Sequence, residues 1–166
     1  MKRFPTLVAG ALAIVAFGVA ATVVLAGTTR HADATGVHIT PLSHGAFGGS
    51  VRAEGAGIEF RTRGPRDMLV TSITVDPGGS FGWHSHPGPV LVAVSKGTLA
   101  VYESHHGSHC VRSTVTAGQA FVEPGAHVHL ARNEGSTPVE LNAVFLARTG
   151  TTEFLNAEQE PKGCNI

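Results

Sequence analysis

Clusters of basic side chains are missing from this chain, whose 12 lysines and arginines are balanced by 12 aspartates and glutamates. Binding to a phosphate backbone depends on clustered lysine and arginine residues that displace counterions. The composition therefore argues against a nucleic-acid partner. A phosphate-binding loop and a Cys-x-x-Cys pair are missing too, so the sequence carries neither of these signatures of nucleotide or dithiol chemistry.

Long apolar runs are absent except near the start of the chain, where residues 7–26 contain no charged side chain and follow a basic beginning. This pattern predicts a helical export signal, residues 1–26, with cleavage after Ala26. About twenty apolar residues also suffice to cross a bilayer, so an uncleaved membrane anchor is the alternative. Residues 27–36 are expected to be a linker. Residues 37–166 are expected to form a domain outside the cytoplasm, secreted or held at the membrane only through the apolar run.

Cysteine is scarce as well, because Cys110 and Cys164 are the only two in the sequence. Both lie in the part expected to be exported, where an isolated pair favours a disulfide. Such a bridge closes a loop of roughly fifty residues, which is worth about 4 kcal/mol in the chain-entropy model. The alternative is a thiolate metal ligand at Cys110, beside His105, His106 and His109.

Helical periodicity is almost absent after the linker, where only residues 153–160 show a short helical pattern. Short runs rich in β-branched residues recur instead, separated by glycine and proline turns, and this pattern predicts an all-β barrel or sandwich. Residues 41–57 are expected to be a loop around one short strand at most, and residues 76–79 a turn. The strands are expected at residues 58–63, 68–75, 90–94, 98–102, 110–116, 119–122, 127–132 and 139–147, with 90–94 and 98–102 paired as a hairpin.

Two histidines separated by one residue, His84 and His86, are the most informative feature of the chain. On an extended strand, side chains two residues apart share a face at a separation of roughly 6.6 Å. Both imidazoles can therefore point at one ion, and imidazole is a common ligand of zinc, iron, copper and nickel. The aromatic neighbours Phe81 and Trp83 are expected to pack in the core or at its rim.

A third histidine, His129, follows a second turn that contains Pro124 and Gly125. Strands that are distant in sequence can face each other across the lumen of an antiparallel barrel, so His129 is the natural third ligand. His127 shares its face by strand parity and is a candidate for a fourth ligand or a general base. The alternative is that His127 lies, partly exposed, in the turn before the strand.

These two segments resemble the paired motifs of the cupin superfamily, over about residues 70 to 147. The first motif has a glycine, a His-x-His pair and a second glycine, and the second has a glycine, a Pro-x-Gly turn, a histidine and an asparagine. The resemblance implies a jelly-roll β-barrel with a metal in its lumen, as in small single-domain exported cupins of the actinobacterial type. The matching residues are Gly78, His84, His86 and Gly97, then Gly118, Pro124, His129 and Asn133, with Ala126 at the Pro-x-Gly glycine.

One position departs from the family pattern, because the metal-binding glutamate of the first motif falls at Val90 and the neighbouring Leu91 supplies no oxygen either. The resemblance then implies a site of three histidines without a carboxylate. Such a site favours one divalent ion of iron, zinc, copper or nickel over manganese, which prefers oxygen ligands. Glu103 and Glu123 are expected to be a solvated residue and a turn residue.

Three functions are compatible with this site, and no catalytic residue is assigned. The first is a module that binds an unknown small molecule at the metal, in a lumen lined by Val90, Val92 and Val94. The second is a metal-dependent enzyme, a three-histidine dioxygenase or an isomerase. The third is metal storage, or structural display of the histidine-rich loop at residues 105–109. Because cupins often pair through sheet edges, a homodimer is also compatible with the sequence.

Overall fold

The computed structural model describes residues 34–105 and 109–166. The expected export signal or anchor, most of the expected linker and His106 lie outside these residues. Strand β1 begins at Thr35 and so includes the last two residues of the range expected as a linker. Within the two described ranges, no helix has the length and apolar character needed to cross a membrane.

The described residues form eleven strands and are all-β, as the sequence predicts. In chain order the strands are β1 (Thr35–Phe47), β2 (Arg52–Gly55), β3 (Ile58–Arg61), β4 (Arg66–Ser85), β5 (Val90–Lys96), β6 (Thr98–His105), β7 (His109–Thr116), β8 (Ala120–Glu123), β9 (His129–Arg132), β10 (Val139–Arg148) and β11 (Asn156–Ala157).

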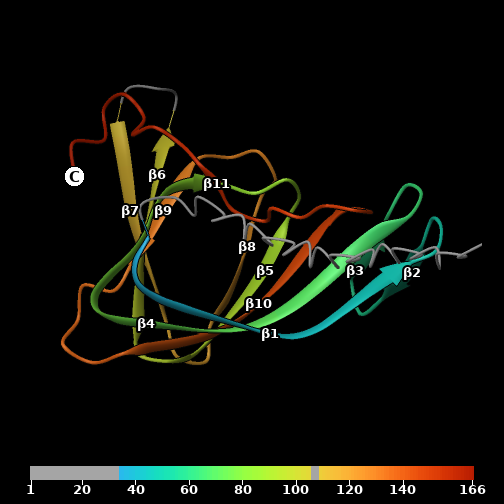
Figure 1. The fold of residues 1–166 in the computed structure, drawn as a ribbon, viewed down its shortest axis with the longest axis horizontal. Coiled ribbons are helices and arrows are strands. Elements are labelled where there is room, and N and C mark those ends of the chain that lie inside the picture. Colours follow the sequence, from blue (N-terminus) through green and yellow to red (C-terminus); the bar gives the residue numbers. More distant parts are fainter. Residues whose placement is uncertain (1–33, 106–108) are drawn as a thin grey trace, which may run out of the picture.

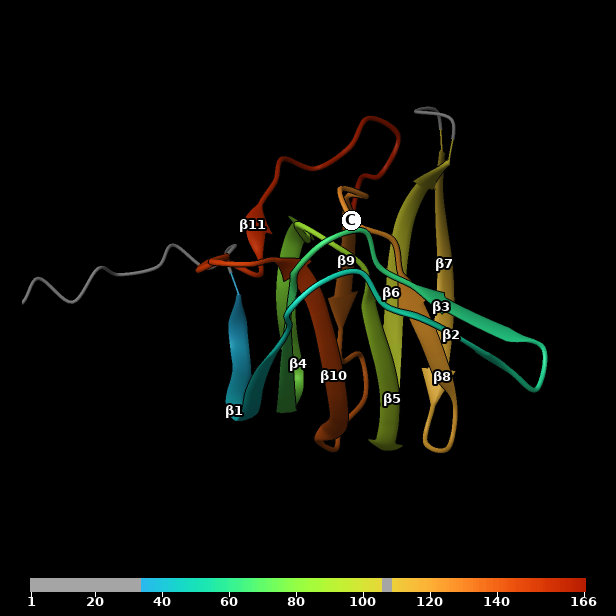
Figure 2. The same cartoon turned by 90° about the vertical axis from the view of Figure 1, so that its right-hand side faces the viewer.

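The long strand β4 joins the two walls of a nearly closed antiparallel barrel. Its first half pairs with β1 and β10, and β10 continues through β5 to β8. Figure 2 shows this wall as β1, β4, β10, β5 and β8 side by side. The second half of β4 pairs with β9 and β11, and the wall continues from β9 through β6 to β7. This arrangement is an all-β barrel, as the sequence predicts.

The turn expected at residues 76–79 is a corner inside β4 rather than the end of a strand. Gly78 adopts a φ of 74°, which favours glycine, and its N–H donates to the Asn133 carbonyl. A Cβ on Gly79 would lie 2.7 Å from the carbonyl oxygen of Gly36. The glycines therefore let one strand bend from the first wall into the second. Residues 80–85 consequently lie across the lumen from β5.

The expected hairpin between residues 90–94 and 98–102 is wrong. Both segments are strands, but β5 pairs with β10 and β8, whereas β6 pairs with β7 and β9. Gly97 turns between them with a φ of 78°, and a Cβ there would lie 3.1 Å from the Pro138 carbonyl oxygen. The chain thus passes over the end of β10 and enters the opposite wall.

The loop expected at residues 41–57 is wrong too, because β1 runs through it to Phe47 and β2 follows. Strand β1 pairs with β4 only and most of its residues are exposed, so its sequence does not need the apolar alternation of a core strand. An edge strand also tolerates Pro41, after which the register shifts. Strands β2 and β3 form a hairpin that extends away from the barrel (Figure 1).

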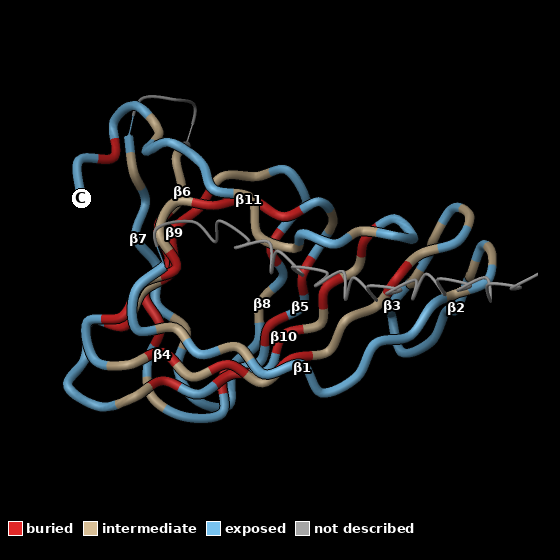
Figure 3. Tube along the Cα trace, viewed as in Figure 1, coloured by how far each residue is buried: buried red, intermediate tan, exposed pale blue. Residues whose placement is uncertain are grey.

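The core fills the space between the walls. Alternate residues of β5 point inward, so Val90, Val92 and Val94 are buried as expected. The inward residues of β10 lie beside these valines, because β10 is the neighbouring strand of the same wall. Figure 3 shows the buried stretches around the lumen and the exposed backbone of β1 and the β2–β3 hairpin. The core consists of Ile73, Val75, Phe81, Val90, Val92, Val94, Leu99, Val101, Ala131, Val139, Leu141, Ala143 and Phe145.

The C-terminal tail, residues 149–166, packs back onto the barrel. The helical pattern predicted for residues 153–160 is wrong, since that segment contains β11, which pairs with Ser85 and His84 of β4. A disulfide joins Cys110 of β7 to Cys164, as the sequence predicts. Cys110 is therefore not a free thiolate for a metal.

Candidate metal centre

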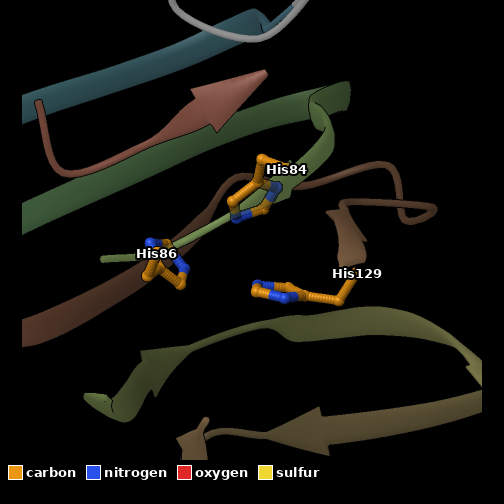
Figure 4. Close-up of side chains that lie close together, drawn as sticks. All are labelled: His84, His86 and His129. Atoms are coloured by element: carbon orange, nitrogen blue, oxygen red, sulfur yellow. The ribbon is translucent and has the colours of Figure 1, made fainter. Parts of the chain in front are cut away.

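The structure brings His84, His86 and His129 together in the barrel lumen. His84 lies near the end of β4, His86 follows that strand, and His129 begins β9 as the cross-strand partner of His84. All three are at most 2% exposed, and their potential ligand atoms lie within 4.8 Å of one another. Figure 4 shows the three rings turned toward a common space. The structure thus brings His84 and His86 together with the distant His129, as the sequence predicts.

The backbone fixes the orientation of each ring. The Nδ1 atoms of His84, His86 and His129 lie 2.9, 2.8 and 3.0 Å from the carbonyl oxygens of Gly82, Phe154 and His127. A carbonyl oxygen can only accept a hydrogen bond, so each Nδ1 carries the proton. In the neutral rings each Nε2 then presents a lone pair, as a metal ligand requires.

Two of the potential ligand atoms have no hydrogen-bond partner. Nε2 of His86 and Nε2 of His129 are buried and make no hydrogen bond. Buried polar atoms are almost always satisfied, so such orphans call for a partner. The adjoining cavity is about 20 Å³, which is room for a single ion or water. The donor set, its tautomers and this space fit a divalent metal ion.

Glu123 is the functional residue that the sequence interpretation missed. It is the last residue of β8, its side chain is 9% exposed, and its carboxylate faces the cluster. One oxygen lies 3.1 Å from Nε2 of His86 and the other 3.1 Å from Nε2 of His129. The expectation of a turn residue was wrong because β8 extends one residue further than predicted and Glu123 takes the inward position.

Charge in the cluster is divided between the carboxylate and the imidazoles. Burial alone would raise the pKa of Glu123, but contacts with His129 and His86 outweigh it and lower that pKa to about 2. Burial lowers the pKa of His84 to about 3, helped by the neighbouring imidazoles. Burial also opposes a charge on His129, but Glu123 outweighs it and raises that pKa. The lumen therefore holds a fixed negative charge next to a neutral His84.

His127, the candidate extra ligand, lies outside the cluster of three. It precedes β9, and its side chain is 40% exposed with Nδ1 3.5 Å from an oxygen of Glu103. Its described contribution to the site is the carbonyl that holds the ring of His129. Phe81 is a core residue that stacks on His84, and Trp83 packs beside the core, as expected.

Two further motif positions serve the backbone. The buried side chain of Asn133 donates to the carbonyls of Val75 and Thr137 and accepts from the N–H of Gly135, which ties the turn after β9 to β4. Ala126 has a φ of 58° where the family motif has glycine, and its N–H donates to the His86 carbonyl at 2.7 Å. These residues hold the histidines in place without facing the ion site.

Comparison with known proteins supports the motif interpretation. The family model for the cupin domain matches residues 71–145, which include the three histidines. Germin-like protein 1-1 of rice (Oryza sativa subsp. japonica) is 33% identical over 91 residues, 54% of this chain and 42% of the rice protein. Germin-like protein 5-1 of the same organism is 32% identical over 104 residues, 61% of this chain and 47% of the rice protein.

Both matches span less than half the length of the rice proteins. Among solved structures, an oxalate oxidase is 25% identical, with 49% of this chain and 46% of that chain covered and a TM-score of 0.43. An oxalate decarboxylase from Bacillus subtilis, solved at pH 4.6, is 14% identical and covers 54% of this chain and 23% of that chain, with a TM-score of 0.48.

Proposed function

We propose that this protein, whose residues 71–145 match the family model of the cupin domain, binds one divalent transition metal in the barrel lumen through His84, His86 and His129. The observation that carries the proposal is the orientation of the rings. Each Nδ1 is engaged by a backbone carbonyl, and the orphaned Nε2 atoms of His86 and His129 face the lumen. Buried polar atoms of a metal-free core usually have hydrogen-bond partners, whereas these two Nε2 atoms have none and face only the Glu123 carboxylate, at 3.1 Å.

The walls of the lumen favour a small-molecule binding module. Apart from the cluster itself, the described residues that line the cavity are apolar. With about 20 Å³ of space, the lumen has room for a single ion or water, so a small molecule of very few atoms would reach the ion only if side chains of the wall moved. When bound, the ion would supply Lewis-acid chemistry to such a ligand. The apolar walls exclude bulk water, and the histidines fix the position at which a ligand meets the metal.

A metal-dependent enzyme is the second candidate, because a buried carboxylate also lies at the site. Among the described lining residues, Glu123 is the only carboxylate, and within reach of a metal-held ligand it could hold or accept a proton. Oxygen uptake that depends on stoichiometric iron would favour this candidate over a binding module. Metal held in excess of one ion per chain would favour storage instead.

The proposal places the protein outside the cytoplasm, secreted or anchored through residues 7–26. A disulfide between Cys110 and Cys164 supports this location, because such bonds persist in oxidising compartments. Processing of the N-terminal segment can be read from the mass of the mature protein.

The test is metal binding by the full chain, expressed with its own N-terminal segment and purified without a histidine tag. We expect one equivalent of metal in the wild type, by elemental analysis after reconstitution. His84→Ala should lower the metal affinity by about 100-fold or more, since a ligand is lost. The control is His38→Ala, which removes an exposed histidine paired with Asp76 and should bind as the wild type. A wild-type protein that takes up no metal would refute the proposal.

A further inference from the structure

We propose that Glu123 is the fourth metal ligand, so that the carboxylate of the site comes from β8 instead of β5. The inference rests on the proposed function, since it concerns the same ion. The family motif places its glutamate at the position of Val90, and Val90 is the cross-strand partner of Glu123. Both residues are buried, and both line the same cavity.

Replacement across this strand pair is sterically reasonable. Directly opposite residues of an antiparallel pair have Cβ atoms about 5 Å apart, on the same face of the sheet. A glutamate side chain is long enough to reach the same point in the lumen from either strand. The Val90–Glu123 pair thus carries its acidic residue on β8, whereas the motif places the glutamate on β5.

The distances around Glu123 are those of ligands that share an ion. Its two oxygens lie 3.1 Å from the Nε2 atoms of His86 and His129. Two ligand atoms about 2.1 Å from a metal and at right angles to each other are about 3.0 Å apart. The same spacing occurs in ion pairs, so the distances alone do not distinguish a metal from a proton.

Hydrogen-bond geometry supplies the distinction. The Nδ1 atoms donate to backbone carbonyls, so the atoms that His86 and His129 turn toward the carboxylate are their Nε2 atoms. Nitrogen lone pairs and carboxylate oxygens that face each other repel unless a cation, a proton or a metal ion, lies between them. Neither contact meets the geometry of a hydrogen bond, since both Nε2 atoms are without a hydrogen-bond partner. A metal ion that binds all the facing acceptors resolves the repulsion without a directed N–H···O bond.

The proposed ligand changes which metals suit the site. Three neutral imidazoles would leave the full charge of a divalent ion uncompensated among apolar walls, whereas Glu123 contributes one negative charge and an oxygen ligand. Carboxylate oxygen suits manganese, and imidazole suits zinc, copper, iron and nickel. The expectation that manganese is disfavoured depended on Val90 and on the absence of a carboxylate. With Glu123 as a ligand, manganese belongs among the metals that the site accepts.

The test compares Mn(II) and Ni(II) affinities of the full-length protein and Glu123→Gln by calorimetric titration. Glu123→Gln should lower the Mn(II) affinity by about 100-fold and the Ni(II) affinity by less than about tenfold, because nickel keeps its imidazole ligands. Asp67→Asn is the matched control. Asp67 is a buried carboxylate outside the lumen that accepts from the N–H of Gly150, and its loss should leave both affinities unchanged.

A double variant, Val90→Glu with Glu123→Val, tests the exchange itself. It returns the carboxylate to the motif position on β5, and we expect the Mn(II) affinity to recover to within about tenfold of the wild type. A structural role for Glu123 would not predict this recovery. If the double variant does not fold, the Mn(II) affinities of Glu123→Gln and the wild type still decide whether Glu123 is a ligand.

The outcomes separate this inference from the proposed function. Glu123→Gln with wild-type Mn(II) affinity, or a wild-type protein that binds nickel but not manganese, would overturn Glu123 as a ligand and leave the three-histidine site standing. A wild-type protein that binds neither metal would refute both.

Discussion

The disulfide between Cys110 and Cys164 links the stability of the fold to the candidate metal centre. Residues 149–166 supply the Phe154 carbonyl that holds the ring of His86 at 2.8 Å. The same tail contains Leu155, which lines the cavity beside the histidines. Releasing the end of the tail should therefore lower the stability of the fold and also loosen the orientation of His86.

The size of the stability effect follows from the length of chain that the disulfide closes. The two cysteines are 54 residues apart, and the chain-entropy model assigns about 4 kcal/mol to a loop of that length. We expect the double variant Cys110→Ser, Cys164→Ser to lower the free energy of unfolding by up to this amount. For a domain of this size, such a loss corresponds to a decrease in melting temperature of about 12 °C.

Urea unfolding followed by circular dichroism, with the protein free of metal, measures the free energy directly. Reduction of the wild type should reproduce the effect of the double variant, and the double variant should not respond to reductant. Metal titration of the oxidised wild type and of the double variant then tests whether His86 keeps its orientation. We expect the double variant to bind the metal about tenfold more weakly than the wild type. A change below about 1 kcal/mol together with unchanged metal affinity would refute the reasoning, because the tail would be held without the disulfide.

Three further predictions concern the backbone and a surface charge. Gly88→Ala would place a Cβ 1.9 Å from a main-chain carbonyl oxygen and should cost about 2 kcal/mol or more in urea unfolding, whereas Gly45→Ala, with no atom within 4 Å, should cost much less. Ala126→Gly should raise the unfolding free energy by about 0.5 kcal/mol, because it relieves the left-handed conformation at a smaller cost in chain entropy; a loss would contradict this. Hydrogen bonds from the Tyr102 hydroxyl and two arginines lower the pKa of Glu134 from 4.5 to about 2. The ionised Glu134 therefore stabilises the fold above about pH 4.5, and this stabilisation is lost as the pH falls toward 2. The difference in melting temperature between the wild type and Glu134→Gln should accordingly disappear in acid. A difference that stays constant with pH would contradict this.

The strands of the barrel were largely predictable, whereas their partners were not. Alternating valines mark β5, and alternating apolar residues between 139 and 147 mark β10, so both were located from sequence. Periodicity carries no information on which strand lies beside which. Gly97 illustrates the difficulty, since the same turn residue suits a hairpin and the crossing between walls that the structure contains. Edge strand β1 was missed because its exposed residues need no apolar alternation.

The histidines of the site were predictable because each has a local signal. His84 and His86 share a strand face, and His129 follows a recognisable turn in the second motif. Glu123 has no such signal, since a glutamate before Pro124 reads as a turn residue. Its inward direction depends on β8 pairing with β5, a contact between segments about thirty residues apart.

A ligand set in a barrel is therefore better compared by strand register than by spacing along the chain. Comparison by sequence spacing finds Val90 at the position of the motif glutamate and suggests that the site has no carboxylate. Register shows that Val90 faces Glu123 on the neighbouring strand, with both side chains in the same lumen. Because the ion responds only to the positions and charges of the atoms around it, a carboxylate supplied from either strand serves the same purpose. Selection on metal binding would then act on the pair of positions, so an apparent loss at one of them calls for inspection of its cross-strand partner.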